Sequence, residues 1–419
     1  MHSATPKHLH PLLGRRMVDW VLRTARELEA DPLVVVAAPS TAAAFEGVAV
    51  AVQHQPLGTG DAVRSAEKAL RGVDDVLVLS GDTPLLTSAL LRELLDTHRR
   101  ETAAATVLSF EPDDPREYGR VVRNGSGALA AIVEAVDASP EELAIREVNS
   151  SIYVFRAERL WPVLGRLTPK NAQGELYLTD TVSLLTAEGE RVCVHKGGEP
   201  METEGVNTRS ELAVAAAALR DRINEAHMLA GVTIVDPSTT WIEADAVIEP
   251  EAVIHPFTVV GGASRIDTGA EVGPHAVLRD AVVGAGALVG PFCYLRPGTV
   301  LEAGAKAGTF VEIKNSLIGE RTKVPHLSYI GDADVGADSN IAAGNITANQ
   351  AHTRAKTRTA IGSNVRTGVD NTFVAPVSIG DDAWIAAGSV ITEDVPPGAL
   401  AIARERQVNK EGRGGKRND

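Results

Sequence analysis

Two hydrophobic patterns follow one another along the chain, and one replaces the other near residues 208–231. In the first part, short runs of β-branched and aliphatic residues alternate with amphipathic segments of helical period. The short runs predict strands, and the amphipathic segments predict helices. The expected strands lie at residues 33–38, 48–52, 76–80, 104–110 and 152–155, and the expected helices at 18–29, 61–70 and 88–99. Strands that alternate with helices of this length form βαβ units, so we expect an α/β domain with a mainly parallel sheet.

The stretch between the two patterns predicts one long helix. Residues 209–229 are rich in Ala, Leu, Glu and Arg, and Gly231 follows them as a stop signal. We expect this helix to join two domains.

From residue 232 onward, aliphatic side chains recur at steps of six residues. Phased runs begin at Ile248, Val283, Ile318 and Ile361, and a glycine follows many of the repeated positions. This period is typical of a left-handed parallel β-helix, in which each hexad supplies one short strand and one turn. We expect the aliphatic side chains to stack inside and the glycines to allow the backbone geometry of the corners. The longest break in phase, at residues 341–361, predicts an extruded loop that covers a site.

Composition narrows the function classes. The chain of 419 residues has a net charge of −14, which disfavours general binding to nucleic acid because phosphate contacts need clustered cations. The two cysteines, Cys193 and Cys293, are too few for a disulfide framework or a cysteine zinc site. The apolar runs are too short to cross a bilayer, and the N-terminus lacks the apolar core of a signal peptide. We therefore expect a cytoplasmic protein with no membrane or nucleic-acid partner.

Two features of the first half indicate phosphate chemistry. Asp82 follows the strand predicted at 76–80, where ligands of open α/β sheets bind, and a carboxylate there can hold Mg²⁺. The alternative is that Asp82 caps the next helix. The turn LGTG at residues 57–60 precedes a predicted helix and lets a ligand approach the backbone, although many tight turns share this sequence.

One histidine of the second half suits acid–base chemistry. Polar clusters interrupt the hexads at residues 296–298, 311–315 and 323–332. Acetyl transfer to an amine needs a base that accepts the proton of the attacking nitrogen, and an imidazole is suited to this task. His326, in the third cluster, is our candidate for the base, and the alternative is a solvated turn histidine.

The order of several short motifs carries a family resemblance. In chain order they are PKHLH (6–10), QHQPLGTGDA (53–62), SGDTPLL (80–86), YGRVV (118–122), NAQGELYLTD (171–180) and EGVNTR (204–209). With these motifs the first half resembles sugar-1-phosphate nucleotidyltransferases. With the hexapeptide repeats behind them, nearly the whole chain resembles the bacterial bifunctional N-acetylglucosamine-1-phosphate uridyltransferase/glucosamine-1-phosphate N-acetyltransferases.

The resemblance implies a domain plan and a metabolic role. The plan is a Rossmann-like nucleotidyltransferase domain at 1–208, a linker helix at 209–231, a β-helical acetyltransferase domain at 232–408 and a disordered tail at 409–419. The role is the synthesis of UDP-N-acetylglucosamine, a cell-wall precursor. The implied substrates are glucosamine-1-phosphate, acetyl-CoA, N-acetylglucosamine-1-phosphate and UTP. Because acyltransferases with a parallel β-helix are trimers with active sites between subunits, the resemblance also implies a homotrimer.

In the first half, the resemblance implies a Mg²⁺-dependent uridyltransferase site. Asp82 and Asn207 are implied to hold Mg²⁺, and Lys7 to contact the phosphates of UTP. The other implied substrate-binding positions are Gln53, Gly58 and Thr59 at the uracil, Ser80 and Gly81 beside Asp82, and Gly119, Glu134 and Asn149 at the sugar phosphate.

In the second half, the resemblance implies His326 as the general base of acetyl transfer. The positions implied to bind glucosamine-1-phosphate are Arg296, Lys314, Tyr329 and Asn349, with Asn340 orienting the amine. The positions implied to contact acetyl-CoA are the Ala343 amide, Ala387 and Arg404.

The sequence departs from the family pattern in two main places. The strand and glycine-rich loop that precede the PK motif in the family are not in this sequence, so either the start codon is placed too late, or the chain is truncated and its uridyltransferase is expected to be weak or dead. Residues 349–352 read NQAH where the family has NYDG, so looser sugar binding is expected. Two alternatives therefore stay open: a relative that retains only acetyl transfer, and a non-catalytic trimeric scaffold that binds nucleotide sugars.

Overall fold

The computed structural model describes residues 1–350 and 355–411, which belong to two compact units. The first unit is Met1–Ala216 and the second begins at Ala217. The helix expected between the two patterns is α8 (Arg209–Leu229), with the bounds read from the sequence. Of the expected tail, residues 412–419 lie outside the described residues, as do Ala351 and His352 of the altered NQAH stretch. No helix in the described part of the chain has both the length and the hydrophobicity needed to cross a bilayer.

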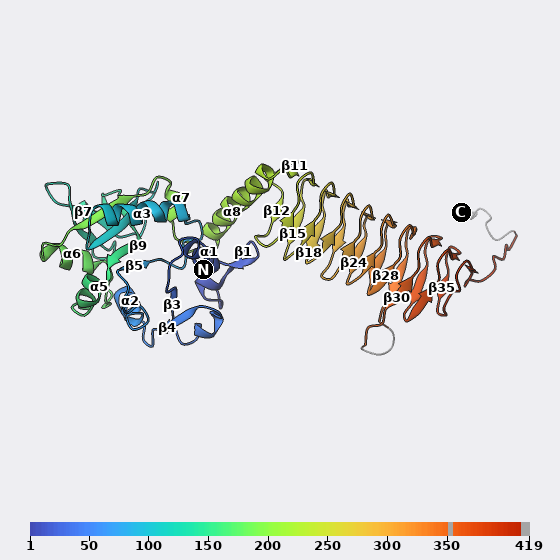
Figure 1. Cartoon of the computed structure of the whole chain (residues 1–419), viewed down its shortest axis with the longest axis horizontal. Helices are drawn as coiled ribbons and strands as arrows, with labels where there is room; N and C mark the ends of the chain where they lie inside the picture. The colour runs from blue at the N-terminus through green and yellow to red at the C-terminus, as the bar shows by residue number, and fades with distance from the viewer. Residues whose placement is uncertain (351–354, 412–419) are drawn as a thin grey trace, which may run out of the picture. The chain divides into compact units, whose positions relative to one another are not determined.

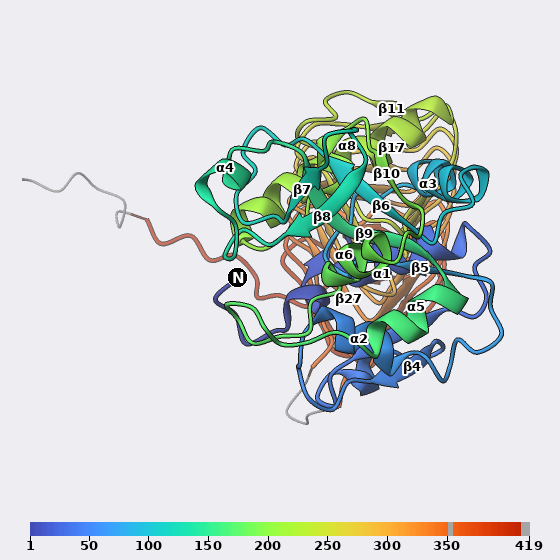
Figure 2. The ribbon, with the colours of Figure 1, turned by 90° about the vertical axis from the view of Figure 1, so that its left-hand side faces the viewer.

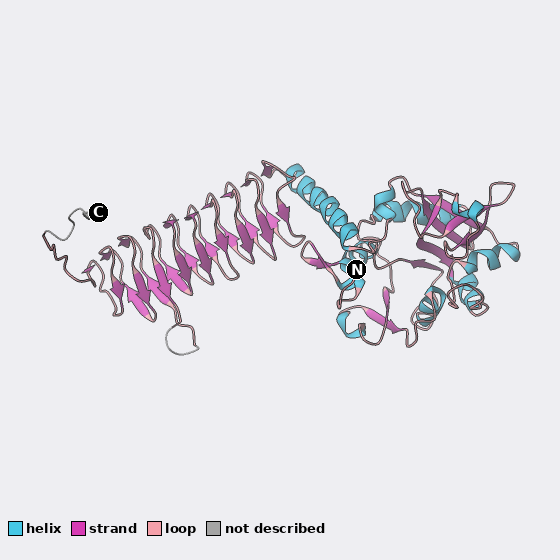
Figure 3. Ribbon diagram, turned by 180° about the vertical axis from the view of Figure 1, so that it is seen from behind, coloured by secondary structure: helices cyan, strands magenta, loops and turns pink. Residues whose placement is uncertain are grey.

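The first unit contains every helix and strand expected for it, with shifted ends. Its helices are α1 (Met17–Arg26), α2 (Thr59–Ser65), α3 (Ser88–Arg100), α4 (Pro140–Leu143), α5 (Ala157–Leu164), α6 (Asp180–Ala187) and α7 (Pro200–Thr203), with 3-10 turns η1 (Lys7–Leu9) and η2 (Ala42–Ala44). Its strands are β1 (Pro11–Leu12), β2 (Arg15–Arg16), β3 (Val34–Ala37), β4 (Ala49–Val52), β5 (Asp75–Val78), β6 (Ala105–Phe110), β7 (Arg120–Arg123), β8 (Leu129–Val133), β9 (Val148–Arg156) and β10 (Val192–Lys196). Figure 3 shows these helices in cyan around the strands of this unit.

The main sheet of the first unit is mixed, so the α/β class is confirmed but the expectation of a mainly parallel sheet is wrong. The strand order is β10-β6-β9-β7-β8, and β5 pairs with β9. Only β10 and β6 run parallel, whereas β9 is antiparallel to β5, β6 and β7. Figure 2 labels the strands of this sheet, β5 to β10. The connections explain the difference, because a short turn after β7 joins it to β8 as a hairpin, and parallel neighbours need a long crossover. Strands β3 and β4 form a separate parallel pair.

The second unit is a parallel β-helix whose strands stack in columns (Figure 1). One column contains β11 (Thr233–Ile234), β14 (Val253–Ile254), β17 (Glu271–Val272), β20 (Leu288–Val289), β23 (Lys306–Thr309) and β26 (Lys323–His326), and is continued through Asn340 by β31 (Arg366–Thr367), β34 (Trp384–Ile385) and β36 (Leu400–Ala401). The next contains β12 (Trp241–Ile242), β15 (Val259–Gly261), β18 (Val277–Arg279), β21 (Tyr294–Leu295), β24 (Glu312–Lys314), β27 (Tyr329–Gly331), β29 (Ile346–Ala348), β32 (Thr372–Val374) and β35 (Val390–Ile391). The third contains β13 (Val247–Ile248), β16 (Arg265–Ile266), β19 (Val282–Val283), β22 (Val300–Leu301), β25 (Leu317–Ile318), β28 (Ala333–Val335), β30 (Thr359–Ile361) and β33 (Val377–Ile379). The β-helix predicted from the hexads is confirmed.

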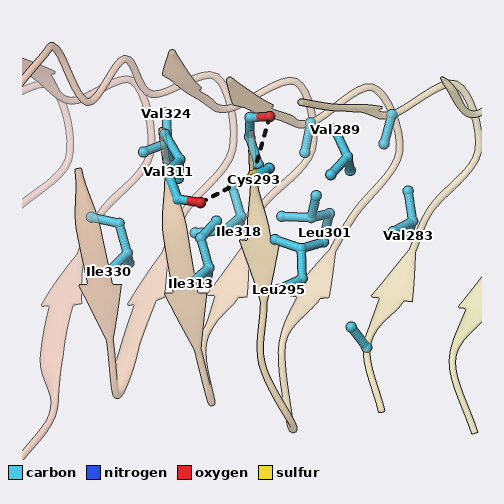
Figure 4. Close-up of a cluster of buried hydrophobic side chains, with 14 of the residues drawn as sticks. Val283, Val289, Cys293, Leu295, Leu301, Val311, Ile313, Ile318, Val324 and Ile330 are labelled. Carbon is cyan, nitrogen blue, oxygen red and sulfur yellow. Dashed lines mark hydrogen bonds between the residues drawn. The ribbon is translucent and has the colours of Figure 1, made fainter. Parts of the chain in front are cut away.

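The repeated aliphatic side chains form the core of this β-helix, as expected. Ile248, Val283, Ile318 and Ile361, which begin the four runs, are all buried. Figure 4 shows side chains from successive coils stacked on one another along the interior. The Cys293 thiol donates to the Val311 carbonyl oxygen at 3.1 Å, and burial raises the pKa of this thiol to about 12. Cys293 is therefore a core residue and not a reactive thiol.

The expected reason for the repeat glycines is wrong for most of them. Of the glycines that follow the repeated positions, only Gly273 and Gly290 have positive φ, of 103° and 109°. Most of the others lie where backbones of adjacent coils approach closely: a Cβ at Gly284 would lie 2.8 Å from the Leu301 carbonyl oxygen. The corner positions with positive φ are instead often occupied by residues other than glycine. Phe292, with φ of 54°, is one example.

Candidate functional site

Three residues from distant parts of the first unit meet around the ammonium of Lys7. Lys7 lies in η1, Asp82 follows β5, and Asn207 precedes α8. Lys7 Nζ donates to Asp82 Oδ2 in an ion pair and to Asn207 Oδ1 at 2.7 Å. The Ser80 hydroxyl donates to the other carboxylate oxygen of Asp82 at 2.6 Å. The two residues implied to hold a metal therefore both present a side-chain oxygen to one cation.

Neither Asp82 nor Asn207 caps a helix. The N-cap of α3 is Thr87, whose hydroxyl accepts a hydrogen bond from Leu90 N at 3.3 Å. At the start of α8, the Thr208 hydroxyl accepts from Glu211 N at 3.1 Å, which is the bond of an N-cap. The alternative interpretation of Asp82 as a helix cap is therefore wrong, because its carboxylate instead accepts from Lys7 and Ser80.

The structure brings Gly119, Glu134 and Asn149 together on the main sheet. Asn149 N donates to the Gly119 carbonyl oxygen at 2.8 Å, and a Cβ at Gly119 would lie 3.3 Å from Glu134 Oε2. Glu134 accepts a hydrogen bond from the Thr179 hydroxyl at 3.0 Å, and burial raises the pKa of its carboxyl. Asn149 is buried and donates to the Tyr153 hydroxyl at 2.7 Å. Ser151 N donates to Asn149 Oδ1 at 3.0 Å, so the Asn149 amide is engaged within the protein. Of this cluster, only the Glu134 carboxyl lines the cavity of this unit and can bind a hydroxyl group there.

The turn at residues 57–60 is held against residues 176–178. Gly58 has φ of 115°, and a Cβ there would lie 2.6 Å from the Leu176 carbonyl oxygen, so no side chain fits. The Thr59 hydroxyl accepts from Leu178 N at 2.9 Å. Gln53 Nε2 donates to the Gly58 carbonyl oxygen at 3.2 Å and to Asp61 at 3.0 Å. Gln53, Gly58 and Thr59 therefore lie side by side, and their role at a uracil stays a prediction.

A cavity of about 460 Å³ in the first unit is lined by one or more residues of each of these three groups. Its polar wall includes Lys7, Thr59, Asp82 and Glu134. Its apolar wall comes from the facing strands β3 and β5 and the helices α1 and α2. The volume lies in the range of roughly 300–1,000 Å³ that is usual for small-molecule sites. Ser80 and Gly81 also line the cavity, whereas Gln53, Gly58, Gly119, Asn149 and Asn207 are not in its wall.

The second unit carries a polar cluster on successive coils of one column. Arg296 follows β21, Lys314 ends β24, Tyr329 begins β27 and Asn349 follows β29. Arg296 donates to Glu312 at 2.8 Å, and Asn349 Nδ2 donates to the Tyr329 hydroxyl at 3.4 Å. These four sequence-predicted residues are therefore neighbours on one face of the β-helix.

A further cation, Lys356, belongs to this cluster and was missed in the sequence. The Lys314 ammonium beside it lowers the pKa of Lys356, and the charge of Arg296 acts in the same direction. Three cations held close together are the usual counterpart of a phosphate group. The signal that could have found Lys356 is the basic stretch RAKTR at residues 354–358, which interrupts the hexads.

His326 lies at the corner next to this cluster. It ends β26 and is exposed, and its carbonyl oxygen accepts from Gly344 N at 3.4 Å. The corner residues 327–328 separate it from Tyr329. In the part of the chain that the structure describes, no side chain is hydrogen-bonded to its imidazole. The exposed ring is therefore free to meet a substrate.

The positions implied to contact acetyl-CoA lie on successive coils at one corner. The Ala343 carbonyl oxygen accepts from Asp370 N at 2.8 Å, and Val369 O accepts from Gly388 N, next to Ala387, at 2.9 Å. A Cβ at Gly388 would lie 3.7 Å from Arg404 Cδ. Asn340 lies in the first column, where it bridges Lys323 and Arg366. Ala343, Ala387 and Arg404 thus form a row, and Asn340 lies on an adjoining strand.

Comparisons with known proteins cover both units. The family model described as "MobA-like NTP transferase domain" matches residues 1–228. "Bifunctional protein GlmU" of Streptomyces avermitilis is 49% identical over 438 residues, covering 98% of this chain and 91% of the relative. The protein of the same name from Mycobacterium tuberculosis (strain ATCC 25177 / H37Ra) is 46% identical over 457 residues, covering 98% and 89%. The one from Caldanaerobacter subterraneus is 44% identical over 432 residues, covering 98% and 94%.

Proposed function

We infer that the two units of this chain catalyse two successive transfers, because the chain belongs to the family of bifunctional GlmU proteins. It is a bifunctional nucleotidyltransferase and acetyltransferase that synthesises UDP-N-acetylglucosamine from small sugar phosphates and a nucleotide. The family implies acetyl-CoA and a divalent metal. The observation that carries this conclusion is similarity over 98% of the chain. The enzyme is proposed to work in the cytoplasm, where UTP and acetyl-CoA are available.

In the acetyl transfer, glucosamine-1-phosphate is proposed to bind with its phosphate at Arg296, Lys314 and Lys356. The proximity of these three cations supports this placement. The His326 imidazole accepts a proton from the amine, and the nitrogen attacks the thioester carbonyl carbon of acetyl-CoA. The carbon–sulfur bond breaks, and the sulfur takes the proton from the His326 imidazolium, so that coenzyme A leaves as the thiol.

The remaining residues of that half are proposed to position the two substrates. Tyr329 and Asn349 hold the sugar, and Asn340 orients its amine. The Ala343 N–H donates a hydrogen bond to acetyl-CoA, which also contacts Ala387 and Arg404. The row that these three residues form along one corner supports this assignment.

For the uridylyl transfer, the metal is proposed to be Mg²⁺, held by Asp82 and Asn207. These residues fit the ion, because their side-chain oxygens already converge on one cation, the Lys7 ammonium. Mg²⁺ prefers oxygen ligands and is commonly bound by one or two carboxylates together with substrate phosphates. The bound ion would neutralise charge on the triphosphate.

The other residues of the first unit are proposed to align the reacting groups. Lys7 contacts the phosphates of UTP, while Gln53, Gly58 and Thr59 recognise its uracil. The sugar-side residues Gly119, Glu134 and Asn149 hold N-acetylglucosamine-1-phosphate. An oxygen of this sugar phosphate attacks the α-phosphorus of UTP, and pyrophosphate leaves. No protein nucleophile is needed, since catalysis here rests on positioning and charge neutralisation.

One preparation assayed for both products tests this function. The purified chain, given glucosamine-1-phosphate, acetyl-CoA, UTP and Mg²⁺, is expected to release coenzyme A and pyrophosphate and to accumulate UDP-N-acetylglucosamine. Release of coenzyme A without pyrophosphate, also when N-acetylglucosamine-1-phosphate is supplied directly, would support the relative that only transfers acetyl groups. A folded protein that binds the nucleotide sugar but releases neither product would support the scaffold.

A homotrimer is proposed to form through an exposed stripe of corner residues on the β-helix. The rings of Phe257, His275, Phe292 and Phe310 stack in sequence, with centroid distances of 4.7, 4.7 and 5.2 Å. The three phenylalanines and Leu327, at the same corner, are exposed. Exposed apolar stripes of this kind are typical of protein interfaces. Because Leu327 follows His326, contact along this stripe would bring a second copy next to His326.

Phe310→Asp is expected to dissociate the trimer, because it places a charge in the middle of the stripe. Sedimentation velocity should show the mass of three chains for the wild type and of one chain for the variant. Val247→Asp, at an equally exposed apolar position in another column, is the control and should remain trimeric. A Phe310→Asp protein that sediments like the wild type would rule out this stripe as the interface.

A further inference from the structure

The carboxylate of Asp332 lies at the centre of the polar cluster in the second unit. Asp332 follows β27 and is 4% exposed, which is unusual for an aspartate unless it is paired. Its N–H donates to the Lys314 carbonyl oxygen at 2.9 Å, and its carbonyl oxygen accepts from Thr359 N at 3.1 Å. The coils before and after it therefore both fix its backbone.

Three side chains donate hydrogen bonds to this carboxylate. Asn315 Nδ2 donates to Oδ1 at 2.6 Å, Lys314 Nζ lies 3.2 Å from Oδ2, and Asn349 Nδ2 donates to Oδ2. Burial works against the charge, but these three donors together lower the pKa of Asp332. Asp332 is therefore an ionised carboxylate whose two oxygens are both engaged by the protein.

The bond from Asn349 settles which end of that amide faces the cluster. An ionised carboxylate only accepts hydrogen bonds, so the NH₂ group of Asn349 must point to Asp332. The same nitrogen donates to the Tyr329 hydroxyl at 3.4 Å, so both of its hydrogens have acceptors within the cluster. Within residues 1–350 and 355–411, no group donates to Asn349 Oδ1. That carbonyl oxygen remains for a hydroxyl or amine of a ligand.

The same carboxylate anchors the Lys314 ammonium. Thr357 N donates to the Asn349 carbonyl oxygen at 3.0 Å, which brings the neighbouring Lys356 to this cluster, where its charge and that of Lys314 act on one another. Without an anion, like charges at this separation repel one another. The buried carboxylate of Asp332 offsets this repulsion. The N–H groups of Lys314 that do not bind Asp332 are then available for a second anion, the phosphate of the substrate.

We propose that Asp332 is a positioning residue of the acetyl-transfer site. It turns the Asn349 carbonyl toward the aminosugar and anchors Lys314 for the sugar phosphate, without touching the substrate itself. This inference rests on the proposed acetyl transfer.

Asp332→Asn in the full-length chain tests the proposal. The variant amide no longer dictates the orientation of Asn349 and no longer neutralises Lys314. The KM for glucosamine-1-phosphate is expected to rise roughly tenfold to a hundredfold, the scale of a lost charged hydrogen bond. The KM for acetyl-CoA should not change, because the residues proposed to contact it (Ala343, Ala387 and Arg404) form no hydrogen bond with Asp332.

Two further variants serve as a matched control and as a charge-conserving substitution. Asp334→Asn is the matched control: it makes the same chemical change two residues away, on an exposed carboxylate paired with Arg358, and should leave both KM values unchanged. Asp332→Glu keeps the charge but displaces the carboxylate, so it should remain folded and still raise the KM for glucosamine-1-phosphate. It decides the question if Asp332→Asn does not fold.

The outcomes separate this inference from the proposed function. An unchanged KM for glucosamine-1-phosphate in a folded Asp332 variant would overturn the positioning role. So would a parallel rise of both KM values with a lower melting temperature, which indicates a merely structural role. If the wild-type chain transfers no acetyl group to glucosamine-1-phosphate, the proposed function itself fails and the inference falls with it.

Discussion

His326→Ala is expected to lower kcat for acetyl transfer by roughly a hundredfold to ten-thousandfold, the usual contribution of a general base. The imidazole is exposed at the end of β26, and it is the one histidine in the hexad interruptions at residues 296–298, 311–315 and 323–332. Without it, the proton of the attacking amine has only water as acceptor. Release of coenzyme A, followed with a thiol reagent at saturating substrates, measures the loss.

The His326→Ala substitution is expected to affect acetyl transfer and not uridylyl transfer, which makes the prediction specific. Pyrophosphate release from UTP and N-acetylglucosamine-1-phosphate should be unchanged in the His326→Ala protein, because that chemistry belongs to the first unit. His255→Ala, which removes a histidine of the β-helix outside the proposed interface stripe, should keep full acetyl transfer. Wild-type kcat in His326→Ala would remove His326 from the mechanism and return it to the solvated turn histidine that we considered first.

Asp82→Ala is expected to lower Mg²⁺-dependent pyrophosphate release by roughly a thousandfold, the scale of charge neutralisation by a metal ion. The substitution removes the proposed carboxylate ligand and also the ion-pair partner of Lys7. Steady-state assays over a range of Mg²⁺ concentrations measure both effects. Excess Mg²⁺ should not restore the rate, because the remaining oxygen of Asn207 binds the ion weakly by itself.

The control for this prediction lies at the other end of the same strand. Asp74 is exposed and precedes β5, so Asp74→Ala should leave pyrophosphate release unchanged. Acetyl transfer should also persist in Asp82→Ala. A variant at Asp82 that turns over like the wild type would show that this carboxylate does not hold the metal, and the proposed site would have to be moved.

The fold was predictable wherever a local repeat determines burial. The interior of the β-helix follows from the six-residue period, because each repeated side chain, such as Leu295, packs on its equivalents in adjacent coils. Helices α1 and α3 and the long helix α8 follow from their apolar period and composition, with ends close to those expected. The antiparallel course of β9 was not predictable, because strand direction depends on pairing between segments that are distant in the chain.

The candidate site was predictable in its residues but not in its contacts. Lys7, Asp82 and Asn207 stand in motifs that are separated by about a third of the first unit or more, and only the folded chain brings them to one point. Asp332 and Lys356 stand in polar or basic stretches of the sequence, but those stretches do not show which of their charges is buried or clustered and which is solvated. Their importance comes from neighbours on other coils.

By itself, the sequence determined the two-part architecture, the stacked core of the β-helix, the order of the motifs and the identity of the candidate base. Periodicity and motif order are properties of the chain and need no coordinates. Only the tertiary structure decided that the main sheet is mixed, that most repeat glycines serve close packing between coils, and that the NH₂ group of Asn349 faces Asp332. These three features depend on which backbone and side-chain groups lie opposite one another across coils or strands, and long-range packing alone sets that geometry.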